Sequence, residues 1–280
     1  MGHTVRPPTA ASKPLGTIDH VMPSLIHDDL ADGTRVLRSA LLLDAGFDHA
    51  FSTAVGPNGA RFDLSRPGAS PLDSPPNELT ANLRRFAAAI ADDAVIASPR
   101  QVHGTAIAGA DVAEDTEADL VASADPSLLA AVRTADCVPI LLACRRHGTV
   151  IAVHAGWRGL IANAPAAAVR HLVAGGSTPD DLVAAIGPAI GGDAFEVGPE
   201  VAEAFANAGL ADTVEPRSPR PHVNLHAAAQ RLLRDAGLAA DAIDGEPICT
   251  ASTPGFFSHR RDRGRTGRHL SAIRCWHEPR

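Results

Sequence analysis

The chain has 280 residues, which is enough for one large domain or two small ones, with a core that needs no disulfide staples. Hydrophobic residues make up 45% and charged residues 20%, an ordinary composition for a globular protein. The formal net charge of -7 argues against a general nucleic-acid binder, whose surface would be basic. Small anionic substrates stay open, because they respond to local charge only.

The N-terminus has no charged-then-apolar signal pattern, and no apolar run approaches the roughly 18 residues of a membrane span. Without a secretion signal, the cysteines are expected to be thiols rather than disulfides. We therefore expect a cytoplasmic protein that binds neither membranes nor nucleic acid and exists as a monomer or weak dimer. The cysteines are Cys137, Cys144, Cys249 and Cys275.

The first part of the chain is rich in residues that break regular structure. Residues 1–20 mix Pro, Ser, Thr and Gly without periodicity and are expected to form a flexible arm, which leaves residues 21–280 as a single catalytic domain. Residues 56–76 are dense in Pro, Gly and Asn and predict a long irregular loop. Thr80 is then expected to cap a helix. The apolar face of this helix comprises Leu83, Phe86, Ala87 and Ile90.

Short apolar runs separated by polar residues or glycine fill the middle of the chain and predict buried strands. A helix is expected over Arg158–Val173, with Pro165 as a kink or a restart point. Thr178 has the features of another helix start, since a proline and two acids follow it. The predicted strands are Val95–Ala97, Leu120–Ala122, Leu128–Val132, Val138–Ala143 and Val150–Val153.

The last third of the chain continues this mixture of elements. Residues 184–190 predict a buried strand, residues 199–208 and 225–236 predict amphipathic helices, and residues 269–275 predict a closing strand. Helices and strands are interleaved irregularly. This order favours an α+β fold, with a mixed β-sheet core flanked by helices, over a strict βαβ repeat.

Three short segments each place a potential zinc ligand beside a strand end or a glycine turn. The ligands are His103, Cys137 and His154. Imidazole nitrogen and thiolate sulfur are natural zinc donors, and three protein ligands leave a fourth position for water or substrate, as in catalytic sites. The spacings match no short zinc-finger pattern. A hydrogen-bonded structural role for each histidine and a packing role for the cysteine therefore stay open.

Two segments are candidates for anion binding. Arg158 and Gly159 open a predicted helix, where free N–H groups and the guanidinium would attract a phosphate or carboxylate. A solvated arginine that covers the helix end is the alternative. The arginine-rich segment over residues 256–268 is either a solvated basic loop or a phosphate or nucleotide clamp, in which glycines let the backbone approach the anion.

Several linked motifs in chain order resemble the laccase-domain family of multi-activity purine nucleoside phosphorylases, also called the polyphenol oxidase or peptidoglycan editing factor family. The resemblance runs from about Ala50 to Ile273. It implies a single compact laccase-domain (cytotoxic-necrotizing-factor-like) fold, and it maps the family's metal ligands onto His103, Cys137 and His154. The motifs are QVHG at 101–104, TADCVPILL at 134–142 and AVHAGWRGL at 152–160, with shorter matches at 118–119, 186–190, 195–198, 249–250, 257–258 and 266–268.

The resemblance implies a zinc-dependent enzyme, with copper as the alternative metal, whose ligands are purine nucleosides and phosphate. The implied reactions are phosphorolysis of adenosine, inosine, guanosine and methylthioadenosine, together with deamination of adenosine. The chain departs from the family pattern at Ala54, where the family has arginine, and at His259, where tyrosine is usual. These departures bear on substrate scope more than on metal binding.

Deamination needs a general acid/base next to the metal-activated water, and phosphorolysis needs groups that hold phosphate beside the ribose. The sequence offers candidates for both tasks. The predicted catalytic residues are Asp136, Arg158 and His259, and the predicted substrate contacts are Gln101, Arg158, Glu196 and Arg268, with Glu196 a further acid/base candidate and Arg158 and Arg268 the expected anion contacts.

Three other functions compete with this interpretation. A copper polyphenol oxidase is disfavoured, because the chain has no His-x-His pair and Met1 and Met22 are its only methionines. A metal-free hydrolase with Cys137 as nucleophile and His154 as base would act on amides or peptidoglycan precursors, and metal content distinguishes it. A structural metal fold or interaction module in cell-wall quality control ranks third.

Overall fold

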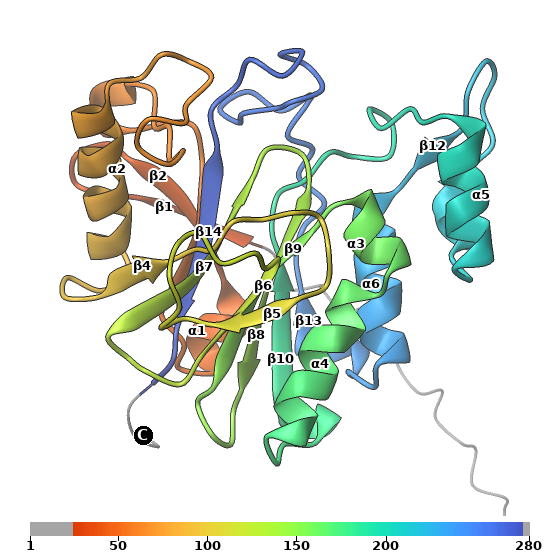
Figure 1. Ribbon diagram of the computed structural model, residues 1–280, viewed down its shortest axis with the longest axis horizontal. Coiled ribbons are helices and arrows are strands. Elements are labelled where there is room, and N and C mark those ends of the chain that lie inside the picture. The colour runs from red at the N-terminus through yellow and green to blue at the C-terminus, as the bar shows by residue number, and fades with distance from the viewer. Residues whose placement is uncertain (1–24, 277–280) are drawn as a thin grey trace, which may run out of the picture.

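The computed structural model describes residues 25–276, so the predicted arm over residues 1–20 lies outside the described part. Two six-stranded mixed sheets pack face to face (Figure 1). In spatial order the first sheet consists of β1 (Leu25–Asp29), β2 (Arg35–Ser39), β3 (His49–Ser52), β14 (His269–Arg274), β7 (Leu128–Thr134) and β4 (Val95–Ala97). The second consists of β13 (Ile243–Asp244), β10 (Leu182–Ile186), β8 (Val138–Cys144), β9 (Val150–Ala155), β6 (Leu120–Ser123) and β5 (Ile107–Gly109). A separate ribbon pairs β11 (Val214–Glu215) with β12 (His222–Val223).

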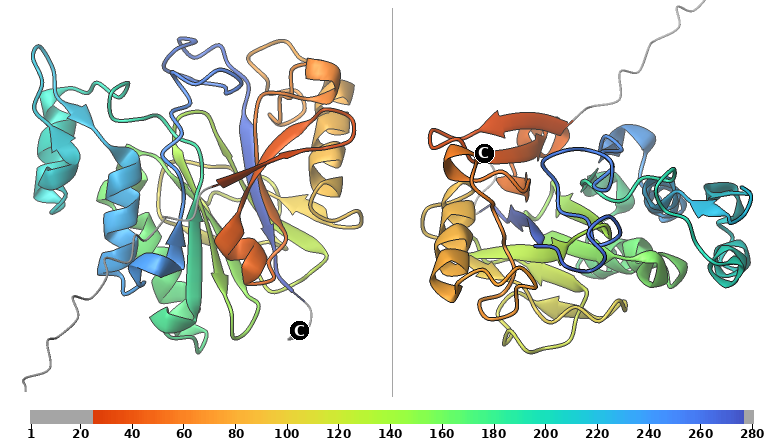
Figure 2. Two further views of the ribbon diagram at one scale, coloured as in Figure 1. Left: turned by 180° about the vertical axis from the view of Figure 1, so that it is seen from behind. Right: turned by 90° about the horizontal axis from the view of Figure 1, so that it is seen from above.

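Helices cover the outer faces of both sheets (Figures 1 and 2). The α-helices are α1 (Ala40–Asp44), α2 (Pro76–Ala88), α3 (Trp157–Ile161), α4 (Ala164–Ala174), α5 (Pro199–Asn207) and α6 (Leu225–Asp235). Helix α2 packs on the first sheet, and α3, α4 and α6 pack on the second. Single 3₁₀ turns lie at Pro57–Gly59, Pro179–Asp181, Ala211–Thr213 and Ala240–Ala242. The α+β fold and the mixed sheet core expected from the sequence are confirmed.

The central strands are buried on both faces, which is why they read as continuous apolar runs. In β7, Leu129 and Ala131 pack toward α2, whereas Ala130 and Val132 pack against the second sheet. This alternation follows from the two-residue period of a strand. Parallel pairing occurs between β4 and β7, between β5 and β6, and between β10 and β13, and antiparallel pairing joins the remaining neighbours.

The helix predicted over Arg158–Val173 divides into α3 and α4. Asn163 adopts a left-handed conformation at φ 61°, and its side chain accepts a hydrogen bond from the Ala166 N–H. Pro165 then occupies the first turn of α4, so the predicted restart is confirmed. The break at Asn163 ends α3 after a short helix. The first residue of α3, Trp157, lines the pocket described below.

One predicted helix start is wrong. Helix α2 begins at Pro76 rather than after Thr80, and the Thr80 hydroxyl donates to the Pro76 carbonyl inside the helix. Pro75 and Pro76 define the start instead, because proline suits the first helical turn. The start predicted at Thr178 is confirmed, with a proline and two acids in the first turn, but the element is a single 3₁₀ turn closed by bonds between Thr178 and Asp181. Among residues 25–276 no helix is long and apolar enough to cross a bilayer.

Candidate functional site

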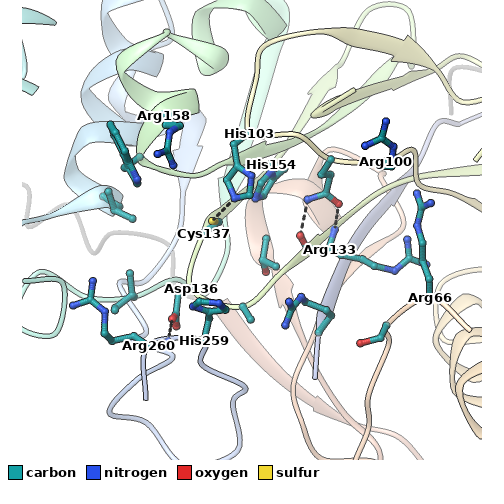
Figure 3. Close-up of a pocket in the computed structure, with 18 of the residues that line it drawn as sticks. Arg66, Arg100, His103, Arg133, Asp136, Cys137, His154, Arg158, His259 and Arg260 are labelled. Atoms are coloured by element: carbon teal, nitrogen blue, oxygen red, sulfur yellow. Dashed lines mark hydrogen bonds between the residues drawn. The ribbon is translucent and has the colours of Figure 1, made fainter. Parts of the chain in front are cut away.

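The three predicted metal ligands converge. Their ligand atoms all lie within 4.8 Å of one another, and the side chains meet at the centre of Figure 3. Cys137 directly precedes β8, and His154 is the second-last residue of β9. These strands pair antiparallel with Pro139 opposite His154, so the start of β8 lies beside the end of β9. His103 comes from the loop after β4, where it adopts a φ of 64°. We call these three residues the His-Cys-His trio.

A buried carboxylate organises both histidines of the trio. Asp119 is 0% exposed, and it accepts bonds from His154 Nδ1 at 2.7 Å, from the Gly104 N–H at 2.6 Å and from the His103 N–H at 2.9 Å. Burial raises the pKa of this carboxyl, but the hydrogen bonds from His154 and the backbone outweigh burial and lower it. Since Asp119 holds Nδ1 of His154, the Nε2 atom is the one free to bind a metal.

The trio fits a metal ion by its donor set and its spacing. A tetrahedral zinc site places sulfur and nitrogen ligands about 3.5 Å apart. Cys137 Sγ and His103 Nε2 are 3.9 Å apart. Gly156 makes this approach sterically available, because a Cβ there would lie 2.9 Å from His103 Cδ2 and 3.1 Å from Cys137 Sγ. The glycine that follows β9 is therefore part of the site.

The surroundings of Cys137 and His154 favour the charged form of each. Burial raises the pKa of the thiol, but the charge of His154 and a hydrogen bond from His103 outweigh burial and bring it down to about 6. Burial lowers the pKa of His154, but the Cys137 thiolate and Asp119 raise it to about 9. A deprotonated sulfur at neutral pH is the form that a metal ion binds.

The trio opens into a cavity of about 700 Å³, within the range of small-molecule sites. Asp136 is the single acidic residue among the described residues that line it. Arginines dominate the charge of the wall. They are Arg66, Arg100, Arg133, Arg158, Arg260 and Arg268.

Three half-buried arginines form what we call the inner arginine group: Arg66, Arg133 and Arg268. Arg133 Nε donates to the Leu64 carbonyl, and the backbone N–H of Leu64 donates to the Arg268 carbonyl. The backbone of Leu64 therefore links Arg133 to Arg268. Burial, followed by the charge of Arg66, lowers the pKa of Arg133 to about 10. Within residues 25–276 none of these three guanidiniums has a carboxylate within 4.0 Å. They form a site that attracts an anion.

Two exposed arginines form what we call the outer arginine pair, Arg158 and Arg260. The guanidinium of Arg158 stacks on Trp157 at 4.3 Å, and that of Arg260 stacks on Phe195 at 5.1 Å from the ring centroid. In Figure 3 this pair lies on one side of the trio, and Arg66 and Arg133 lie on the other. The pocket therefore has two cationic ends with the candidate metal site between them.

Two of the other predicted site residues line the pocket but already have hydrogen-bond partners. The amide of Gln101 bonds both to the Arg133 carbonyl at 2.7 Å and to the Arg133 N–H at 2.8 Å, so it fixes the position of Arg133. Asp136 is 8% exposed, and its two carboxylate oxygens accept bonds from the Thr250 hydroxyl and the Arg260 N–H, each at 2.7 Å. Both residues shape the pocket wall.

The two remaining candidates differ in their relation to the pocket. His259 is exposed and lines the cavity beside Asp136 and Arg260 (Figure 3). Glu196 is exposed, is not part of the lining, and lies 3.8 Å from Arg220.

Sequence reasoning gave no individual role to Asp119, Arg66, Arg133 or Arg260, although Arg260 lies in the arginine-rich segment that it named. Arg133 carried a usable signal, because it is a charged residue inside the otherwise apolar strand β7. Asp119 fell in a short motif match, but only the pairing of β6 with β9 in the structure places it beside His154.

A family model described as "Multi-copper polyphenol oxidoreductase laccase" matches residues 59–276. The chain belongs to this family. The resemblance predicted from the sequence motifs is thereby confirmed. The structure of the Bacillus licheniformis hypothetical protein YfiH has a TM-score of 0.78 and 25% identity, over 89% of this chain and 99% of that one. YlmD from Geobacillus stearothermophilus has a TM-score of 0.75 and 28% identity, over 90% of this chain and 100% of that one.

Curated relatives of this family carry names of purine-nucleoside enzymes. A purine nucleoside phosphorylase from Deinococcus radiodurans is 36% identical over 248 residues, which covers 87% of this chain and 94% of that protein. Adenosine deaminase RL5, from an unknown prokaryotic organism, is 36% identical over 198 residues, which covers 65% of this chain and 75% of that protein.

Proposed function

We propose that this chain is a zinc-dependent enzyme that cleaves purine nucleosides with inorganic phosphate and also deaminates adenosine. The observation that carries the proposal is the His-Cys-His trio, which opens into a cavity lined by the inner arginine group and the outer arginine pair. Within residues 25–276 none of these five guanidiniums has a carboxylate within 4.0 Å, whereas Arg100 pairs with Glu117. The names of the relatives support the same substrate class. The preferred nucleoside among adenosine, inosine, guanosine and methylthioadenosine, the catalytic domain over residues 21–280, the cytoplasmic location and the monomeric state stay predictions.

In phosphorolysis, the bond between C1′ of the ribose and N9 of the purine breaks, and a phosphate oxygen forms the new bond to C1′. The purine leaves with a proton. We assign the phosphate to the inner arginine group, where the guanidiniums of Arg133 and Arg268 bond to backbone carbonyls but have no carboxylate partner within residues 25–276. Gln101 holds Arg133 in place through its two backbone bonds. The predicted role of Arg268 as an anion contact belongs here.

In deamination, water replaces the amino group at C6 of adenine. His103, Cys137 and His154 would hold the metal, which when bound supplies the Lewis acidity that makes water nucleophilic near neutral pH. A proton must also move to the leaving amine. Of the predicted acid/base candidates, His259 fits best, because it is exposed to the cavity, whereas both oxygens of Asp136 already accept hydrogen bonds.

The test is metal analysis of the purified protein combined with an adenosine assay, run with and without phosphate and resolved by chromatography. We expect about one zinc per chain, adenine that forms only when phosphate is present, and some inosine. A Cys137→Ala variant that stays folded is expected to lose both reactions. Survival of either reaction would break the shared-site assignment, and zinc without any nucleoside turnover would refute the substrate assignment.

A second candidate function rests on the closeness of Cys137 to His154, whose ligand atoms lie within 4.8 Å of each other. A thiolate beside an imidazolium that is oriented by Asp119 is also the arrangement of a cysteine hydrolase. The same metal analysis separates the two functions, because a bound ion blocks the sulfur. A metal-free protein that iodoacetamide inactivates rapidly would favour the hydrolase, and stoichiometric copper would favour the oxidase chemistry in the family's description.

A further inference from the structure

The outer arginine pair is not part of the phosphate site proposed above, although the sequence predicts Arg158 as an anion contact. In Figure 3 the trio lies between Arg66 and Arg133 on one side and Arg158 and Arg260 on the other, so we assign the inorganic phosphate to the inner arginine group alone. Within residues 25–276, neither arginine of the outer pair has a carboxylate within 4.0 Å. The pocket therefore holds more unpaired positive charge than one phosphate neutralises.

The outer pair is also held in place before any ligand arrives. Stacking on Trp157 and Phe195 restricts both guanidiniums. Arg260 is further fixed by its backbone N–H, which donates to Asp136 at 2.7 Å, and by Nη1, which donates to the Glu196 carbonyl at 3.0 Å. Guanidiniums that are restricted in advance lose less freedom when they bind an anion, so such positions suit specific recognition of phosphate.

We propose that the outer arginine pair binds the 5′-phosphate of the substrate, so that the enzyme accepts purine nucleoside 5′-monophosphates. This inference rests on the proposed phosphorolysis at the same trio. In a nucleotide, the 5′-phosphate and the C1′ carbon lie at opposite sides of the ribose ring. An inorganic phosphate at the inner arginine group can then reach C1′ while the 5′-phosphate contacts Arg158 and Arg260 on the far side.

The reaction balances without any further reactant. With AMP, the C1′–N9 bond breaks, an oxygen of inorganic phosphate bonds to C1′, and adenine leaves with a proton. The sugar product is ribose 1,5-bisphosphate rather than ribose 1-phosphate. This difference identifies the substrate, because a contaminating phosphatase that first converted AMP to adenosine would lead to ribose 1-phosphate.

The experiment compares AMP with adenosine on the metal-loaded, full-length protein. Adenine release is followed by chromatography, and the sugar product is identified by mass spectrometry. Arg158→Gln is the test variant, and it leaves no buried group unsatisfied because Arg158 is exposed. Arg66→Gln changes the other end, and Arg170→Gln, on the exposed side of α4, is the matched control. Binding of both ligands is measured separately by calorimetry in phosphate-free buffer at low salt.

We expect adenine and ribose 1,5-bisphosphate from AMP. A hydrogen bond to a charged group contributes enough that Arg158→Gln should lower the ratio of kcat/KM for AMP to that for adenosine about tenfold or more. Arg66→Gln should instead raise the KM for inorganic phosphate with both substrates, and Arg170→Gln should change neither. Binding of AMP should weaken as ionic strength rises.

Cleavage of adenosine without cleavage of AMP would overturn the inference and leave the proposed function standing. Ribose 1-phosphate as the only sugar product, or an unchanged AMP-to-adenosine ratio in Arg158→Gln, would overturn it as well. The binding measurement decides if neither compound is cleaved. AMP that binds no more tightly than adenosine then refutes the inference, whereas tighter binding that Arg158→Gln removes supports the 5′-phosphate site and refutes only the phosphorolysis.

Discussion

Gly156 offers a perturbation that reaches the candidate metal site without touching a ligand. In a Gly156→Ala protein the new Cβ would lie 2.9 Å from His103 Cδ2 and 3.1 Å from Cys137 Sγ. Carbon atoms in contact lie about 3.5 Å apart or more, so His103 must move by about 0.6 Å. Metal–ligand distances tolerate about 0.2 Å, so this movement exceeds what the metal can absorb.

The backbone itself accepts alanine, because Gly156 has a φ of -72°. His103 is exposed and can yield, so the free energy of unfolding should change by about 1 kcal/mol or less. Metal affinity should fall about tenfold or more. Gly159→Ala is the matched control. Its Cβ would meet nothing closer than 3.6 Å, so metal affinity should stay unchanged.

The assay is competition for zinc against a chromophoric chelator, with thermal unfolding of the metal-free proteins measured in parallel. A Gly156→Ala protein with the affinity of the unaltered protein would refute the claim that these three side chains share one ion. Equal losses in Gly156→Ala and Gly159→Ala would also refute it, because the effect would then come from the helix and not from the ligands.

Asp119→Asn should lower metal affinity about 10- to 100-fold, because the amide cannot accept all the bonds that orient His154 and the 103–104 backbone; an unchanged chelator competition would contradict this. Gly187→Ala should lower the free energy of unfolding by about 1–3 kcal/mol in denaturant titrations, because its Cβ would lie 2.3 Å from Phe51 Cδ1. His49 and His269 are buried and accept backbone N–H bonds at Nε2, so burial lowers the pKa of each to about 4. The native state therefore binds fewer protons than the unfolded state between pH 6.5 and 4. The free energy of unfolding should keep its whole value above pH 6.5 and fall by up to about 3 kcal/mol per histidine toward pH 4. Denaturant titrations that give the same free energy of unfolding at pH 6.5 and pH 4 would refute this.

The sequence predicted the central strands and missed most of the first fifty residues, for a physical reason. Strands β8 and β9 are buried on both faces and carry an uninterrupted apolar run. Strand β1 lies at a sheet edge with Ile26 exposed and acids at its end, so it has neither a continuous apolar run nor a clean alternation. Its pairing with β2 depends on tertiary contact, which local pattern does not encode.

The candidate metal ligands could be predicted from the sequence, but the residue that orients them, Asp119, could not. His103 and Cys137 have side chains that bind zinc, lie near predicted strand ends and fall in recognisable motifs. The local sequence pattern does not distinguish Asp119 from other acidic residues, and only the pairing of β6 with β9 places it against His154. Likewise Arg268 was predicted as an anion contact from its glycine-rich surroundings, but its grouping with Arg133 depends on the neighbouring strands β14 and β7.

The pocket lies where the chain crosses from one sheet to the other. Strand β7 of the first sheet carries Arg133 and continues through Cys137 into β8 of the second sheet. In the inner arginine group, Arg133 lies on the first sheet, whereas His154 of the trio lies on the second and Cys137 directly precedes it. Phe51 of the first sheet approaches Gly187, which follows β10 of the second, and we expect this contact to help set the distance between the anion site and the candidate metal. A change in that contact should alter the KM for phosphate as well as stability, whereas a change under α2 should alter stability alone.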